Sequence, residues 1–556
     1  MPAPTGDLQP GNRPVGWPPG DRAPQAMERQ LVLAGGTIRT LDRSTPAVDH
    51  LAVSGSRIAG GRDPAAQQVN LGGACVLPGL NDSHVHFPTW SLAQRQVRLE
   101  DARTRAEALD RVALALAGLP RGAWLRGFGW RGGDWTEAPD RAALDRVAGD
   151  VPVALWAKDY HSLWLNGAAL ARADAPLEVP GGLVERDRDG DPTGVLRENA
   201  AWNFRDRYLI PTLDEMVDAS RDGLAIAAAR GVTAVHDKDG WMGAFEVFQR
   251  LQDAGELTLR VWQSLPADRL AELRALGLHS GFGNEWLRLG YLKVFMDGTL
   301  GSATAHLLDG SGVEITSASR LADIVREAAA AGWPVGVHAI GDAANRAALD
   351  AFEATADTWR PLGLRQRIEH AQLLDPADVA RFGALGVTAS VQFSHAPSDR
   401  DLADRVWEGH PGAYAFRSLL DSGARLVNGS DAPIEELDPL QGLAAGVLRT
   451  LDERPPWRAE QAVSVGEALS AICLRPVELA HDEKRRGTLV SGKLADLVVV
   501  DRDPFTCSRE ELREIAVLAT MVGGRWVHTT ENAPKGIGEA SWSGSHGLRL
   551  RRRAQR

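Results

Sequence analysis

Short apolar runs that alternate with helix-like stretches are the feature of this sequence that most restricts its fold. The helix-like stretches are rich in alanine and leucine, as in RLADIVREAAAA and ANRAALDAFEATA. Eight runs have the β-branched and apolar composition of strands: the run that enters SHVHF, and residues 231–237, 257–265, 289–298, 333–341, 365–372, 386–393 and 425–433. Alternation of this kind is typical of parallel sheets, so eight units predict an α/β fold, a closed (β/α)8 TIM barrel.

Both ends of the chain carry a different pattern, in which short apolar runs alternate with glycine turns. LVLAGGTI and LAVSGSRIAGG lie near the start, whereas GTLVSGKLADLVVVDRDP and VLATMVGGRWVH lie near the end. Such runs predict paired antiparallel strands. We therefore expect residues 29–78 and 485–532 to combine into one small β-sandwich beside a barrel made of residues 79–484.

One segment interrupts the barrel pattern, from about residue 91 to about residue 211. It contains GGLVERDRDGDPTGVLREN, a hairpin-like stretch that turns at Asp189 and Gly190. An insertion after the first barrel strand emerges at the C-terminal face, where the active sites of this fold lie, so we expect an inserted α/β subdomain that covers the substrate. The Pro- and Gly-rich residues 1–28 and the basic tail 533–556 are expected to be disordered.

Composition excludes several classes of protein. With 62 basic and 73 acidic residues, the net charge of -11 would repel a phosphate backbone, and we expect no nucleic-acid partner. No apolar run is long enough to span a membrane, so no membrane partner is expected either. The three cysteines lie far apart, which indicates neither a disulfide framework nor a zinc knuckle and favours the cytoplasm. We expect a small-molecule substrate and, as the commonest assembly of soluble enzymes, a homodimer.

Four histidines stand where a barrel places functional residues. His84 and His86 are separated by one residue, so on a strand both side chains point to the same side and can bind one metal ion. His338 ends the run WPVGVH, and His370 ends RIEH. A single histidine at a strand end is commonly structural, but four at the ends of three predicted strands favour a metal site.

Asp431 and Lys293 complete this group of candidates. Asp431 follows the eighth predicted strand, where a carboxylate can bind a metal and accept a proton, although a turn or helix N-cap also explains it. Lys293 lies in an apolar strand, where an ammonium is costly unless it is paired or modified. Carbamylation would make it a carboxylate able to bridge two cations, whereas a head group that reaches solvent is the simpler interpretation of this residue alone.

Taken together, these motifs resemble the amidohydrolase superfamily, in particular amidohydrolase family 3, which includes N-substituted formamide deformylases. The resemblance extends from Leu31 to about His528. It rests on LPGLNDSHVHF, LRGFGW, DYHSLWLNGAAL, GGLVERDRDGDPTGVLRE, GVTAVHD, LKVFMDGTLGSATA, VGVHAIGDAAN, RIEHAQ, VTASVQFSHAPSD, LVNGSDAP and GKLADLVVVDRDP.

The resemblance implies a binuclear centre of two zinc ions, with other transition metals as alternatives. The ligands that it implies are His84, His86 and Asp431 for the more buried metal, carbamylated Lys293 as the bridge, and His338 and His370 for the second metal. It also implies cleavage of a C–N bond in an amide, formamide or cyclic amide by a metal-activated hydroxide. Asp431 would then act as general base and acid.

The residues that contact the substrate are less well defined. Candidates chosen by their placement in the insertion and the barrel loops are Trp130, His161, Asn166, Asp297, Gln392 and His395. Two alternative functions also stay open. The same fold could hydrolyse a lactone or a phosphoester, because fold and metal do not fix the bond that is cleaved, or the chain could be a non-catalytic regulatory relative.

Overall fold

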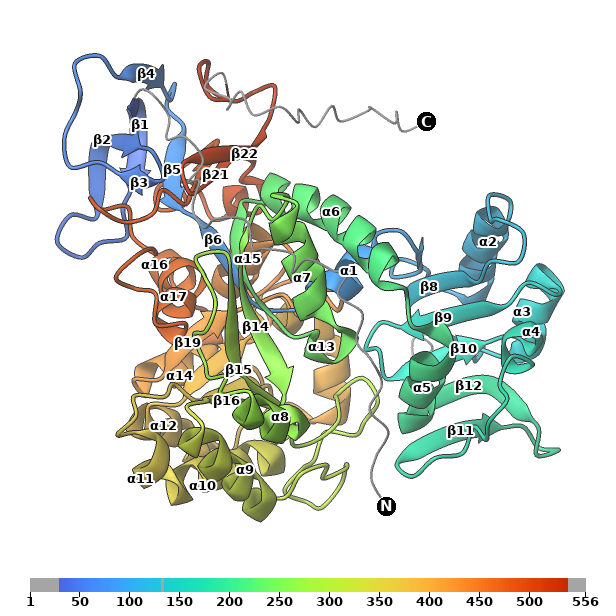
Figure 1. The fold of residues 1–556 in the computed structure, drawn as a ribbon. Coiled ribbons are helices and arrows are strands. Elements are labelled where there is room, and N and C mark those ends of the chain that lie inside the picture. The colour runs from blue at the N-terminus through green and yellow to red at the C-terminus, as the bar shows by residue number, and fades with distance from the viewer. Residues whose placement is uncertain (1–29, 132–134, 539–556) are drawn as a thin grey trace, which may run out of the picture.

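The computed structural model of the chain describes residues 30–131 and 135–538. The N-terminal segment and most of the basic tail, both predicted to be disordered, lie outside these ranges. Figure 1 shows three parts: a central barrel, a sheet built from both ends of the chain, and an inserted lobe beside the barrel. In the described ranges, no helix combines the length and the apolar character that crossing a bilayer requires.

The central barrel is a parallel sheet of eight strands, and it confirms all eight runs predicted from the sequence. Its strands, in spatial order, are β6 (Leu80–Val85), β13 (Val232–Asp237), β14 (Arg260–Pro266), β15 (Leu287–Phe295), β16 (Val335–Ala339), β17 (Arg367–His370), β18 (Thr388–Val391) and β19 (Arg425–Asn428). A parallel bridge between Val85 and Ala432 joins the segments that follow the first and last strands. The C-terminal ends of all eight strands therefore surround one mouth.

Amphipathic helices follow the strands and cover the outside of the barrel (Figure 1). In α9 (Ala318–Ala330), Leu321, Val325 and Ala328 recur at helical spacing and are buried, and the Ser317 side chain caps the first turn. The other helices of this part are α6 (Leu213–Ala229), α7 (Ala244–Asp253), α8 (Leu270–Ala275), α10 (Asp342–Ala354), α11 (Ala356–Trp359), α12 (Pro376–Leu385), α13 (His395–Val406), α14 (Phe416–Asp421), α15 (Pro439–Leu448), α16 (Val465–Leu469) and α17 (Arg475–Leu479).

Strands from both ends of the chain combine, as the sequence predicts, and the sheet that they form is mixed, with parallel as well as antiparallel pairs. The strands are β1 (Leu31–Arg39), β2 (Ala47–Ser54), β3 (Arg57–Ile58), β4 (Gln67–Asn70), β5 (Cys75–Pro78), β20 (Leu497–Val500), β21 (Val517–Val522) and β22 (Arg525–Thr529). The two ends meet where β5 pairs antiparallel with β20, with Val76 opposite Val499. Apolar residues from both ends share one buried cluster. A buried ion pair between Arg260 and Asp496 at 2.7 Å fixes this sheet to the barrel.

The inserted lobe lies between β6 and β13, where the sequence predicts an insertion. Its sheet and helices comprise β7 (Val97–Arg98), β8 (Leu125–Trp130), β9 (Val153–Ala157), β10 (Ser162–Leu165), β11 (Gly182–Arg186), β12 (Pro192–Glu198), α2 (Arg105–Leu116), α3 (Arg141–Ala148), α4 (Gly167–Leu170) and α5 (Asn199–Phe204). The helix α1 (Phe87–Ala93) precedes the lobe and packs against α6 of the barrel. The predicted hairpin is present, because β11 and β12 pair around a turn in which Gly190 has a φ of 88°.

Candidate active site

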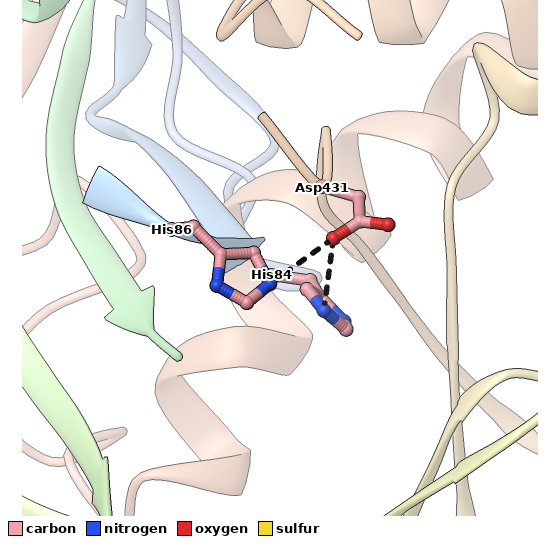
Figure 2. Close-up of side chains that lie close together, drawn as sticks. All are labelled: His84, His86 and Asp431. Atoms are coloured by element: carbon pink, nitrogen blue, oxygen red, sulfur yellow. Dashed lines mark ion pairs between the residues drawn. The ribbon is translucent and has the colours of Figure 1, made fainter. Parts of the chain in front are cut away.

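The first barrel strand brings two imidazoles to one carboxylate (Figure 2). His84 lies on β6 and His86 directly follows it, whereas Asp431 follows β19 on the neighbouring side of the mouth. His84 Nε2 lies 3.2 Å from Asp431 Oδ1, and His86 Nε2 lies 3.6 Å from the same oxygen. Ligand atoms of the three residues all lie within 4.8 Å of one another, which is compatible with one shared metal ion.

Two further carboxylates set the orientation of these imidazoles. His84 Nδ1 lies 2.9 Å from Glu369 Oε2, and His86 Nδ1 lies 2.7 Å from Asp239 Oδ1. A carboxylate at Nδ1 takes the ring proton in a hydrogen bond, which leaves the Nε2 lone pair free to bind a metal. Both free nitrogens therefore face Asp431.

His370 and His338 lie next to this group. The ring centroids of His84 and His370 are 4.7 Å apart, and those of His338 and His370 are 4.5 Å apart. His370 donates from Nδ1 to the side-chain oxygen of Gln392 at 3.0 Å, which leaves the lone pair of Nε2 free. His338 bonds through Nε2 to the carbonyl oxygen of Gly298 at 3.0 Å, so Nδ1 is the nitrogen that remains.

Burial keeps the imidazoles of His84, His338 and His370 neutral. It lowers the pKa of His84 to about 4 and that of His338 to about 3, and neighbouring lysines add to both effects. Burial, and after it the neighbouring His338 imidazole, also lowers the pKa of His370 well below its ordinary value. The neutral ring is the form that binds metals, so at neutral pH all three present lone pairs rather than positive charges.

Lys293, on β15, is buried with an exposed fraction of 2%. Its head group therefore does not reach bulk solvent, whereas the simpler interpretation of the sequence is a lysine head group exposed to solvent. Among the described residues, Nζ makes no hydrogen bond or ion pair, and it lies 5.1 Å from the centre of the Phe295 ring. Burial lowers the pKa of this amine to about 8. Burial of an amine without a paired acidic side chain costs free energy.

Two of the proposed ligands have unusual backbone conformations. His370 has a φ of 74° and Asp431 a φ of 58°, although neither residue is a glycine. Left-handed conformations at such residues cost on the order of 1–3 kcal/mol each and persist where the surrounding structure imposes them, often at functional sites. The strain supports a functional role for both positions.

A network of buried charges behind the imidazoles was not identified from the sequence. Glu369 accepts from Lys238 at 2.8 Å and pairs with Arg367 at 2.7 Å, while its other oxygen meets His84. All of these side chains are almost completely buried. The motifs VHDKD and RIEH do show charged residues in the sequence, but the sequence alone does not indicate which of these residues pair with one another.

A cavity of about 1290 Å³ opens above the candidate ligands, between the barrel mouth and the inserted lobe. The turn between β9 and β10 reaches into it and is tied to the barrel at several points. Lys158 binds Glu435, which lies close after Asp431, and Asp159 accepts from Ser302 at 2.8 Å. The inserted lobe therefore forms one wall of the cavity.

The predicted substrate contacts divide into two groups. Residues of the first group line the cavity, namely Trp130, His161 and His395. Within this group, the Trp130 indole also donates to Leu155 and His161 pairs with Glu198 at 2.7 Å. Residues of the second group, Asn166, Asp297 and Gln392, are not among the described residues that line it.

The second group makes structural contacts instead. Asn166 caps α4 inside the lobe, where its side chain accepts from the backbone of Ala169 at 3.0 Å. Asp297 accepts from the backbone N–H groups of Ile340, Gly341 and His306 and so joins two loops. Gln392 orients His370, as described above. These three side chains therefore act behind the cavity wall.

Comparison with known proteins places this architecture in a family. A model of the amidohydrolase family matches residues 67–528. Protein LONG AFTER FAR-RED 3 of Arabidopsis thaliana is 31% identical over 549 residues, covering 91% of this chain and 92% of that protein. N-substituted formamide deformylase of Arthrobacter pascens is 28% identical over 540 residues, covering 89% of this chain and 98% of that protein. The crystal structure of an uncharacterized metal-dependent hydrolase from Pyrococcus horikoshii has a TM-score of 0.71 at 26% identity, covering 86% of this chain and 99% of that one. Because the family model spans the barrel, the inserted lobe and every candidate ligand, this chain belongs to the amidohydrolase family.

Proposed function

We propose that this protein is a metal-dependent amidohydrolase that cleaves a C–N bond in an amide, formamide or cyclic amide. The convergence of His84 Nε2 and His86 Nε2 on Asp431 Oδ1 carries the proposal, because the Nδ1 atoms are already held by carboxylates. The geometry of the site is stronger support for this function than the fold is, because barrels of this kind catalyse many different reactions. The deformylase of A. pascens, which by its name acts on N-substituted formamides, supports the choice of a C–N bond.

Two zinc ions are the cofactors that we propose. The residues that would hold them are His84, His86, Asp431, carbamylated Lys293, His338 and His370. When bound, the ions would supply Lewis acidity and lower the pKa of water. The buried, unpaired amine of Lys293 supports the carbamate, because a carboxylate at this position could bind cations where an ammonium could not.

Asp431 is the residue that we propose to move protons. Burial opposes its ionisation, but the imidazoles of His84, His370 and His86 hold its pKa well below the ordinary value. The carboxylate is therefore ionised at neutral pH and can accept a proton from the attacking water. It would return this proton to the leaving nitrogen, because an unprotonated amide anion leaves poorly. The products are an acid and an amine.

The cavity favours a substrate with a bulky apolar part. Its volume of about 1290 Å³ far exceeds what a formyl group needs. Aromatic side chains from the lobe and the barrel line it: Trp156, Tyr160, Trp202, Trp241 and Phe295. Large aromatic walls bind apolar groups, while the polar atoms at the barrel mouth orient the bond that reacts.

Metal analysis combined with a substrate panel tests this function. Purified protein should contain two zinc ions per chain and should hydrolyse members of a series of N-substituted formamides, hydantoins and cyclic ureas. An Asp431→Asn variant should lose turnover with each active substrate. Turnover of lactones or phosphotriesters alone would move the assignment to another bond, and a fully metal-loaded protein without any turnover would favour a non-catalytic relative.

A further inference from the structure

His395 has an unusual position for a residue outside the candidate ligand set. It is the first residue of α13, follows β18 at the barrel mouth, and lines the cavity with an exposed fraction of 4%. One of its ring nitrogens lies within 4.8 Å of ligand atoms of both His370 and Asp431. This imidazole therefore borders the place where the bond of the substrate would react.

One nitrogen of this ring has no partner. His395 Nε2 is buried and makes no hydrogen bond within the part of the chain that the structure describes. A buried polar atom without a partner costs free energy, so such atoms are rare and often mark a place that a ligand fills. His395 lines the cavity, and a molecule bound there is the partner that we assign to this nitrogen.

Gln372 sets the tautomer of the ring. Its side-chain nitrogen lies 3.1 Å from His395 Nδ1, and both side chains are buried. In this orientation of the amide its nitrogen donates, so Nδ1 accepts and carries the lone pair. The proton of the neutral ring is then on Nε2, which makes the unpartnered atom a hydrogen-bond donor.

We propose that His395 Nε2–H stabilises the negative oxygen that forms when water attacks the substrate carbonyl. This role rests on the hydrolysis proposed above. Water oxygen bonds to the carbonyl carbon, the π electrons move to the carbonyl oxygen, and the N–H of His395 donates to that oxygen. When the carbonyl forms again, the C–N bond breaks and Asp431 transfers the proton of the water to nitrogen. Water and amide thus give acid and amine without any further reactant.

The main alternative is that His395 binds metal, because it forms a compact group with His370 and Asp431. A metal ligand needs a free lone pair, and the contact with Gln372 occupies the one on Nδ1. In this tautomer Nε2 carries the proton and has no lone pair to offer a metal. The two roles differ in a measurable way, because removal of a donor leaves the metal content unchanged, whereas removal of a ligand lowers it.

Two kinds of variant separate these roles. His395→Leu and His395→Phe both remove the donor, so one of them suffices if the other does not fold. His395→Gln instead places an amide N–H near the position of Nε2. His528→Leu, on β22 and outside the cavity, is the matched control. Thermal unfolding and zinc content are measured first on each purified protein.

The affinity of the zinc-loaded proteins for methylphosphonate then tests the hydrogen-bond donor without any turnover of substrate. This small tetrahedral anion resembles the intermediate in charge and shape. We expect its affinity to fall about tenfold or more in the Leu and Phe variants, to recover in the Gln variant, and to stay unchanged in the control. On an active substrate, the kcat of the Leu and Phe variants should fall about 10²–10³-fold, with a smaller change in KM, as for the loss of one oxyanion donor.

Each outcome decides the proposal. Unchanged zinc content with weakened anion binding supports the donor role. Loss of zinc from the Leu and Phe variants would overturn it in favour of a ligand, and equal anion affinity in wild type and these variants would also overturn it. If the zinc-loaded wild type turns over no amide, the hydrolytic function fails, and the anion measurement still decides the role of His395.

Discussion

His84 Nδ1 lies 2.9 Å from Glu369 Oε2, so the first candidate ligand is tied to a carboxylate that is itself completely buried. The same carboxylate accepts from Lys238 at 2.8 Å and pairs with Arg367 at 2.7 Å. One side chain therefore orients an imidazole and balances two buried cations. Its loss should affect the stability of the barrel as well as the site.

Replacement of Glu369 by Gln should destabilise the fold by about 3–5 kcal/mol, because the buried side chains of Lys238 and Arg367 would lose the carboxylate that both of them contact. Unfolding in urea measures this change. The double variant Glu369→Gln/Lys238→Met should recover part of the loss, since it removes one of the two cations. Equal unfolding free energies of wild type and Glu369→Gln would show that the network does not stabilise the fold.

Asp239→Asn should weaken zinc binding without a comparable loss of stability. Asp239 holds His86 Nδ1 at 2.7 Å, and a neutral amide would hold the ring less firmly and make it a weaker ligand. Loss of such a partner typically costs 10–100-fold in metal affinity. Zinc titration against a competing chelator measures this, with Asp222→Asn, an exposed aspartate paired with Arg95, as the control. An affinity equal to that of the control would contradict the orienting role.

The barrel was predictable because its signal is local. Each strand is a short apolar run and each helix an alanine-rich stretch, and the candidate ligands stand at the ends of those runs. His338 and His370 are examples, since the strand period and the residue type together place them at the mouth. The topology of a parallel barrel then brings these strand ends together without any further information.

The contacts behind the site were not predictable, because they join residues that are far apart in the chain. Lys238 and Glu369 are separated by 131 positions, and nothing local to either residue indicates the other. Asp297 shows the opposite problem. It stands just beyond the end of β15, where a catalytic residue could lie, but its carboxylate accepts from the backbone N–H groups of Ile340 and Gly341. Sequence position identifies the mouth of the barrel, but not what each side chain does there.

Carbamylation of Lys293 should increase with pH. Burial lowers the pKa of this amine to about 8, so the ammonium predominates below that value, and the neutral amine that reacts with carbon dioxide grows as the pH rises through it. Zinc-loaded protein in ¹³C-bicarbonate should therefore show a carbamate signal by ¹³C NMR that increases from about pH 7 to about pH 9. Lys293→Arg should lack the signal and Lys493→Met should keep it. A protein that binds two zinc ions and shows no carbamate would refute this modification.

Lys158→Met should loosen the lobe over the cavity. Lys158 binds Glu435 and donates to Ser398 at 3.1 Å, and these contacts hold the turn between β9 and β10 against the barrel. Since the turn forms a wall of the cavity and makes no contact with the candidate ligands through this side chain, KM should rise more than kcat falls. We expect kcat/KM to drop roughly tenfold, which is equivalent to about 1.4 kcal/mol.

The double variant Lys158→Met/Glu435→Gln separates this effect from the burial of an unpaired carboxylate. It should regain the stability lost in Lys158→Met, because Glu435 no longer carries a charge, but it should keep the high KM, because the lobe is still untied. Lys493→Met, which removes a contact with Thr488 outside the cavity, is the control for loss of a lysine. A kcat loss with unchanged KM in Lys158→Met would instead place this residue in the chemistry of the site.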